Sequence, residues 1–234
     1  MTSNPFTGFP QETLQFFTDL AANNHKPWFD AHKPDYENYV LAPARDFVVA
    51  MGQRLAALSP NVVADPRVNK SIFRIYRDIR FSKDKTPYKT HLALWFPAQA
   101  GAGKFDNPGY YFHLEPGNLM LGVGLHSFSK PLLKAYRDAV VHPERGPELA
   151  QITAALAQKR YNLGSQTYKR VPRGCDPDHP NAELLRFSGL TAGLNLGLPD
   201  ELQSAGLVDF CFKKYVDMAP IVDWLQKMKE LGGV

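Results

Sequence analysis

The chain has 234 residues, of which 44% are hydrophobic and 21% charged, a composition typical of a folded globular protein that argues against extended disorder. Its formal net charge is +4, whereas the segment 70–96 alone carries seven Lys or Arg and two Asp, a net charge of +5. The positive charge is therefore local, which indicates a site for an anion.

Helical periodicity predicts a helical N-terminal part over residues 1–60. Apolar residues recur with helical spacing over 9–22 and again over 43–58, and Pro43 suits the first turn of the latter helix. Between them, a further helix is expected from Pro27 to Val40. These three helices are interpreted as scaffold.

The middle of the chain, 69–127, alternates apolar and polar residues with a period of two and predicts four strands. We expect an antiparallel meander of 71–80, 90–97, 109–116 and 119–127, with a mobile connection over 98–108. Pro116-Gly117-Asn118 is the clearest hairpin signal.

Alternation also predicts which side chains share a face of this sheet. One face is apolar and is expected to pack on helices. The other gathers charged, tyrosine and histidine side chains: Arg74, Tyr76, Asp78, Arg80, His91, His113, Glu115 and His126. A two-residue loop at 117–118 would set His113 opposite Gly122 and Tyr111 opposite Gly124, which predicts open space above the sheet.

The remaining part, 129–234, is predicted to be mostly helical. We expect helices over 130–141 and 147–158, a charged loop over 167–181, a short helix near 180–186 and a strand near 190–196. A final helix over 200–231 contains Pro220, where a break is expected. The whole chain 1–234 is predicted to form one α+β domain, with helices on one face of a mainly antiparallel sheet.

The first residues lack the basic and apolar regions of a signal peptide, and the apolar runs are too short to span a membrane. Cys175 and Cys211 have no CxxC spacing. We therefore expect a cytoplasmic protein with reduced cysteines and no membrane partner.

Several blocks resemble a conserved hypothetical family, the domain of unknown function 2461. The most specific is FRIYRDIRFSKDKTPYKTH at 73–91, joined by NNHKPWFDAHKPDYE at 23–37, GYYFHLEPG at 109–117 and PRGCDPDHP at 172–180. The resemblance covers nearly the whole chain. It implies no activity, because that family has none assigned.

The sequence favours the binding of an anionic small molecule bearing phosphate or carboxylate, with histidine acid–base chemistry as a further step. Anion ligands are expected among Arg74, Tyr76, Arg80, Lys83, Lys85, Lys89 and His126. Proton transfer would fall to His91 or His113, oriented by Asp78 or Glu115. The segment 82–89 could act as a basic lid, or be a solvated turn.

Three alternatives remain open at this point. A metal site would use His91, His113, Glu115 and His126, although nearby arginines oppose a cation, and no cofactor is predicted. A nucleic-acid-binding module would use the basic segment 70–91 with its interleaved aromatic residues. A structural or partner-binding protein would use the same charges only as surface ion pairs.

Overall fold

A computed structural model of the protein describes residues 5–101, 107–164 and 166–233. The chain divides into two compact units. The first comprises Met1–Phe96, Tyr111–Leu121 and Asn195–Lys213, and the second Pro97–Tyr110, Gly122–Leu194 and Lys214–Val234. The expectation of a single domain stays a prediction. The predicted mobile connection 98–108 falls in part on residues 102–106, which lie outside the described residues.

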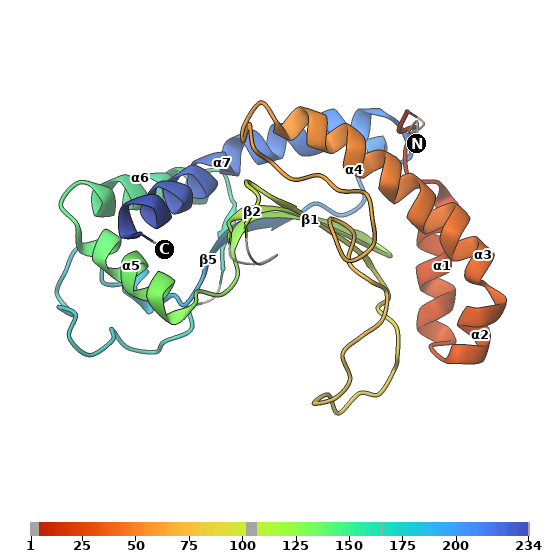
Figure 1. Ribbon diagram of the computed structural model, residues 1–234, viewed down its shortest axis with the longest axis horizontal. Coiled ribbons are helices and arrows are strands. Elements are labelled where there is room, and N and C mark those ends of the chain that lie inside the picture. Colours follow the sequence, from red (N-terminus) through yellow and green to blue (C-terminus); the bar gives the residue numbers. More distant parts are fainter. Residues whose placement is uncertain (1–4, 102–106, 165, 234) are drawn as a thin grey trace. The chain divides into compact units, whose positions relative to one another are not determined.

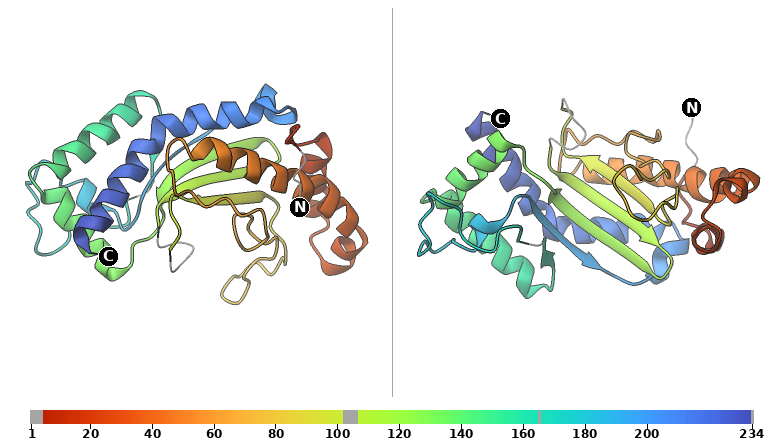
Figure 2. Two further views of the ribbon diagram at one scale, coloured as in Figure 1. Left: turned by 45° about the horizontal axis from the view of Figure 1, so that its top comes forward. Right: turned by 90° about the horizontal axis from the view of Figure 1, so that it is seen from below.

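Five strands form one antiparallel sheet in the order β1-β2-β3-β5-β4 (Figure 2). The strands are β1 Leu92–Pro97, β2 Gly109–Glu115, β3 Asn118–Leu125, β4 Asn162–Leu163 and β5 Leu190–Asn195. The first three are the predicted meander, and β5 matches the strand expected near 190–196. With helices before and after the sheet in the chain, the predicted α+β class is confirmed.

The prediction of a regular strand over 71–80 is wrong. The segment pairs with β1 only at its start, where the Phe73 N–H donates to the Ala93 carbonyl at 3.0 Å. It then pairs with 87–89 instead, where the Arg77 N–H donates to the Pro87 carbonyl at 2.8 Å. Because β1 begins only at Leu92 and Pro87 has no N–H to donate, no continuous ladder can form.

The hairpin between β2 and β3 turns one residue earlier than expected, through Pro116 and Gly117. Gly117 has a φ of 88°, a conformation that glycine adopts without strain. A Cβ at Gly124 would lie 2.1 Å from the Leu190 carbonyl oxygen, so this glycine allows β5 to pair closely with β3. The expected open space above the sheet stays a prediction.

Four α-helices and one π-helical segment make up the N-terminal part. They are α1 Gln11–Ala22, α2 Lys26–Ala31, α3 Lys33–Asp35, the π-helix Tyr36–Leu41 and α4 Ala42–Leu55. The single helix expected from Pro27 to Val40 is thus divided. Pro43 lacks the N–H that would bind the Tyr39 carbonyl in an α-helix, and the buried Thr13 hydroxyl donates to that carbonyl at 2.5 Å.

Aromatic residues form the core of the first unit. The Phe112 ring of β2 packs on Phe47 of α4 at 4.8 Å between centroids and on Phe9 at 5.7 Å. All three side chains are fully buried. The face of β2 predicted to be apolar therefore packs against α4, which Figure 1 shows running across the sheet.

The second unit contains the predicted helices α5 Lys130–Val141 and α6 Arg145–Gln158, and a 3₁₀ turn at Leu184–Arg186. Ser129 caps α5 as expected, its hydroxyl accepting from the Leu132 N–H at 3.4 Å. Tyr136 lies at the centre of this unit: its ring packs edge-on against Trp224, and its hydroxyl donates to the Leu184 carbonyl at 2.8 Å.

After a 3₁₀ turn at Asp200–Gln203, helix α7 extends from Gly206 to Gly232 and continues through Pro220. The expected break is therefore absent. The carbonyl that Pro220 leaves without a donor belongs to Val216, whose side chain is 45% exposed, so water can satisfy it. No described helix is long and apolar enough to cross a membrane.

Candidate functional site

Two predicted site histidines lie in contact in the first unit. His91 directly precedes β1 and His113 lies in the neighbouring strand β2. Their rings stack with centroids 4.2 Å apart and an interplanar angle of 26°. Strand pairing therefore brings together two imidazoles that are 22 positions apart in the sequence.

His113 is held at both of its ring nitrogens. The Tyr111 hydroxyl lies 3.1 Å from Nδ1, and the Glu115 Oε2 lies 3.5 Å from Nε2. These three residues alternate along β2 and so share one face of the strand. A neutral His113 with its proton on Nε2 satisfies both neighbours, because Tyr111 can donate to Nδ1 while the carboxylate accepts.

His91 is neutral at neutral pH. Partial burial, the neighbouring His113 and Lys89 lower its pKa from 6.5 to about 4, against the smaller opposing effect of Glu115. Desolvation disfavours the charged imidazolium, and the nearby positive charges add to that effect. A neutral His91 can stack on His113 without charge repulsion.

Lys89, a basic residue of the predicted set, lies near His91 and contacts a second one, Arg74. The Lys89 ammonium donates to the Arg74 carbonyl at 3.0 Å and lies 5.3 Å from the Phe73 ring centroid. Burial and then the charge of Arg74 lower the pKa of Lys89. The Arg74 side chain is exposed and makes no hydrogen bond or ion pair with any residue that the structure describes.

Phe73 connects these cations to the histidines, because its ring also packs edge-on against Tyr111 at 6.3 Å. We refer to the group as the histidine cluster: Arg74, Lys89, His91, Tyr111, His113 and Glu115. Sequence reasoning named five of these six as site residues. Sequence reasoning used Tyr111 only to predict which residues pair between strands. The position of Tyr111, two residues before His113 on a strand, places both side chains on one face and could have identified it.

The other predicted residues of this region lie in a projecting loop, 76–88, which we call the arm. They are Tyr76, Asp78, Arg80, Lys83 and Lys85. The Asp78 carboxylate accepts from the Arg80 guanidinium at 2.9 and 2.7 Å. These bonds lower the pKa of Asp78 to about 2. Asp78 therefore orients Arg80 within the arm, and Glu115 is the carboxylate beside a histidine.

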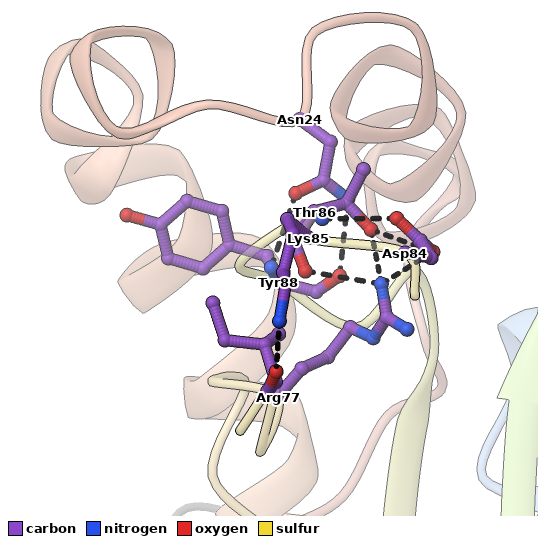
Figure 3. A network of polar contacts seen from close by, with 7 residues as sticks. Asn24, Arg77, Asp84, Lys85, Thr86 and Tyr88 are labelled. Carbon is purple, nitrogen blue, oxygen red and sulfur yellow. Dashed lines mark hydrogen bonds and ion pairs between the residues drawn. The ribbon is translucent and has the colours of Figure 1, made fainter. Parts of the chain in front are cut away.

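A polar network holds the arm together (Figure 3). The Arg77 guanidinium donates to the Asp84 carboxylate at 2.6 Å and to the Thr86 carbonyl at 3.0 Å. Asp84 also accepts from the Thr86 N–H at 2.9 Å, which with Arg77 lowers the pKa of Asp84. Lys85 donates to the Ile79 carbonyl at 2.9 Å. Arg77 thus has a structural place inside the arm.

The base of the arm is fixed to the loop between α1 and α2. Asn24 donates its amide to the Tyr88 carbonyl and accepts from the Tyr88 N–H, both at 3.0 Å (Figure 3). The Tyr88 ring stacks on Phe29 at 4.3 Å. Sequence reasoning missed this role of Asn24, because a contact between positions 64 residues apart has no local signal.

His126 does not belong to the histidine cluster. It follows β3, is exposed and falls in the second unit. Among the described residues, no group of three or more His, Cys, Asp or Glu side chains is arranged to hold a metal ion. The residues that the metal alternative invoked are therefore not brought together as a complete ligand set.

A shallow hollow of about 410 Å³ lies elsewhere in the first unit, between the N-terminal segment, the π-helix and the start of α4. Its polar lining includes Asn38, Asp46 and Gln203, and burial raises the pKa of Asp46. None of the predicted site residues lines it.

The comparisons with known proteins identify the family. Neither the curated proteins nor the solved structures contain a match to the chain. A family model described as conserved hypothetical protein, DUF2461, matches residues 12–224, which include the histidine cluster and the arm. The chain belongs to this family of conserved hypothetical proteins.

Proposed function

We propose that the histidine cluster binds a small molecule bearing a phosphate or carboxylate group, and that His113 exchanges a proton with it. The observation that carries this proposal is the arrangement of His113, stacked on a neutral imidazole and held between a hydroxyl and a carboxylate. The partly buried Lys89 ammonium lies near His91 and donates to the backbone carbonyl of Arg74, whose side chain is exposed.

The cations supply the affinity in this proposal. The Arg74 guanidinium makes no hydrogen bond or ion pair with the described residues, so this planar group is free to form two parallel hydrogen bonds to an oxyanion. Lys89 is partly desolvated beside it. A bound anion would offset the mutual repulsion of the two charges, which favours binding of a negative group at this place.

The histidines supply the chemistry. Imidazole is a suitable proton donor and acceptor, and the Glu115 carboxylate orients the His113 ring. The His113 side chain is only 16% exposed, so its contact with water is limited. His91 is neutral and serves as a stacking surface and hydrogen-bonding group, whereas His113 is the proton carrier.

A thermal-shift titration with orthophosphate, sugar phosphates and dicarboxylates tests the proposal. A ligand present at about a thousand times its Kd should stabilise the protein by roughly 4 kcal/mol. Arg74→Ala should abolish that stabilisation. Arg173→Ala is the matched control, because Arg173 is also exposed and has no ion-pair partner among the described residues.

The proposal is contradicted if none of these anions raises the unfolding temperature, or if Arg74→Ala responds to them as the wild type does. His113→Gln separates binding from proton transfer. It should retain most of the anion-induced stabilisation, because the cations remain, and it should lose any pH dependence of binding near neutrality.

A further inference from the structure

We infer that the arm, residues 76–88, is a binding surface for single-stranded nucleic acid, with Phe81 as a stacking platform for a base. Phe81 is 95% exposed, the highest exposure among the large hydrophobic side chains of the described residues. The arm projects from the first unit as a long yellow loop in Figure 1. This surface is separate from the contacts made within the histidine cluster.

The arm is built to hold a fixed shape. Arg77, Asp84 and Thr86 tie its two sides together from within, and Asn24 clamps its base through the Tyr88 backbone (Figure 3). Its conformation is therefore set before any partner binds, which reduces the entropy lost on association. An aromatic ring presented to solvent on such a support is ready to contact a partner.

Cations and aromatic rings alternate along the arm and its base. The segment 74–89 carries six Lys or Arg and two Asp, a net charge of +4, which equals the formal charge of the whole chain. Arg77 and Arg80 are paired with Asp84 and Asp78. Lys83 makes no hydrogen bond or ion pair with the described residues. Unneutralised positive charge therefore lies beside exposed Phe81.

A second aromatic ring lies nearer the base. Tyr76 packs on Tyr88 at 5.4 Å and remains 52% exposed. Phe81 and Tyr76 could therefore stack two bases of one strand while the cations contact its phosphates. Bases in a duplex are already stacked on each other, so exposed rings of this kind favour a single strand.

The same charges are less well suited to binding an anionic membrane surface. Membrane binding by a loop depends on the apolar area that it inserts, and the tip offers only the one phenylalanine among its exposed large hydrophobic residues. The remaining cations are distributed from Arg74 to Lys89 and not confined to a collar around Phe81. A linear polyanion matches this distribution better than a flat surface.

Fluorescence anisotropy with labelled oligothymidylate of about 16 nucleotides tests the inference. The wild type should bind, with an affinity that falls steeply as salt is raised. Phe81→Ala should weaken binding about tenfold through lost stacking. Lys83→Gln should weaken it as well and lower the slope of log affinity against log salt by about 0.7, the loss of one phosphate contact.

Two matched variants control for general effects. Leu231→Ala removes an apolar side chain that is 70% exposed on α7, and Lys213→Gln removes an exposed charge on the same helix. Neither should change oligonucleotide binding. Circular dichroism of all four variants should match the wild type, because each altered side chain is exposed.

The inference is overturned if the wild type does not bind the oligonucleotide, or if Phe81→Ala and Lys83→Gln bind it as tightly as the wild type. Binding to phosphatidylserine vesicles without binding to the oligonucleotide would also overturn it, in favour of a membrane surface. Because neither Phe81 nor Lys83 belongs to the histidine cluster, this test and the small-anion test can fail independently.

Discussion

At the scale of single residues, the informative feature is the difference between two stacked imidazoles. His91 is partly buried, and this burial, followed by the neighbouring His113 and Lys89, lowers its pKa to about 4. His113 has a carboxylate at one nitrogen and a hydroxyl at the other. Two histidines in contact thus have different surroundings, which is how neighbouring titratable groups come to serve different roles.

The lowered pKa of His91 predicts how stability depends on pH. Between pH 6.5 and about 4 the unfolded state protonates this histidine and the folded state does not. The free energy of unfolding should therefore fall as the pH is lowered through this window. The slope should stay below about 1.4 kcal/mol per pH unit, since His91 is partly exposed and screened.

Urea unfolding at several pH values checks this expectation. His91→Gln should show a flatter dependence than the wild type between pH 6.5 and about 4. His126→Gln, at an exposed position outside the cluster, should keep the wild-type slope. Parallel curves for the wild type and His91→Gln would show that His91 titrates normally in the folded protein.

At the scale of elements, the π-helix Tyr36–Leu41 shows how a proline affects the turn that precedes it. Pro43 suits the first turn of α4, but the same residue leaves the Tyr39 carbonyl without its usual N–H. Thr13 of α1 donates its hydroxyl to that carbonyl. The irregular turn therefore depends on a contact between two helices.

Replacing Thr13 by valine tests this dependence. Valine has nearly the same shape but cannot donate, so the Tyr39 carbonyl would lose its bond from the buried Thr13 side chain. We expect a loss of about 1–3 kcal/mol in the free energy of unfolding. Thr18→Val on the exposed face of α1, where the hydroxyl donates to Leu14 of the same helix, should cost less than about 0.5 kcal/mol. Equal losses in urea unfolding would contradict this account of the π-helix.

The regular elements could be predicted from the sequence because their periodicity is local. Helices α4 and α5 and the strands around His113 follow directly from the spacing of their apolar residues. Segment 71–80 also alternates, yet it pairs with β1 only at its start and then continues into the arm. Whether this segment forms a strand depends on the residues that are available to pair with it. Because β1 begins only at Leu92, it pairs with the start of the segment and not with the rest. Alternation alone does not contain that information.

The same distinction applies to the candidate site. Alternation along β2 correctly placed His113 and Glu115 on one face, and the pairing of β1 with β2 brought His91 to them. Asp78 and Arg80 were assigned to the same face by extending the pattern into 71–80, and they instead pair with each other on the arm. The predicted sharing of one face is confirmed where the strand is regular, whereas the functional role of these residues stays a prediction.

At the scale of the whole molecule, the net positive charge is concentrated in one short stretch. Segment 74–89 carries as much net charge as the entire chain, and it contributes both the cations of the histidine cluster and those of the arm. An anion that approaches the first unit would therefore be attracted mainly to this segment. Both proposals follow from that concentration of charge, and they use different side chains within it.

The most direct test of the central proposal is a heteronuclear NMR titration of the histidine side chains with orthophosphate and with citrate at constant pH. Assignments come from His91→Gln and His113→Gln. The account predicts that the imidazole resonances of His91 and His113 shift along one saturating curve with at least one of these anions, while those of exposed His126 remain in place. If neither anion moves the His91 and His113 resonances, or if His126 moves equally, the histidine cluster is not the anion site.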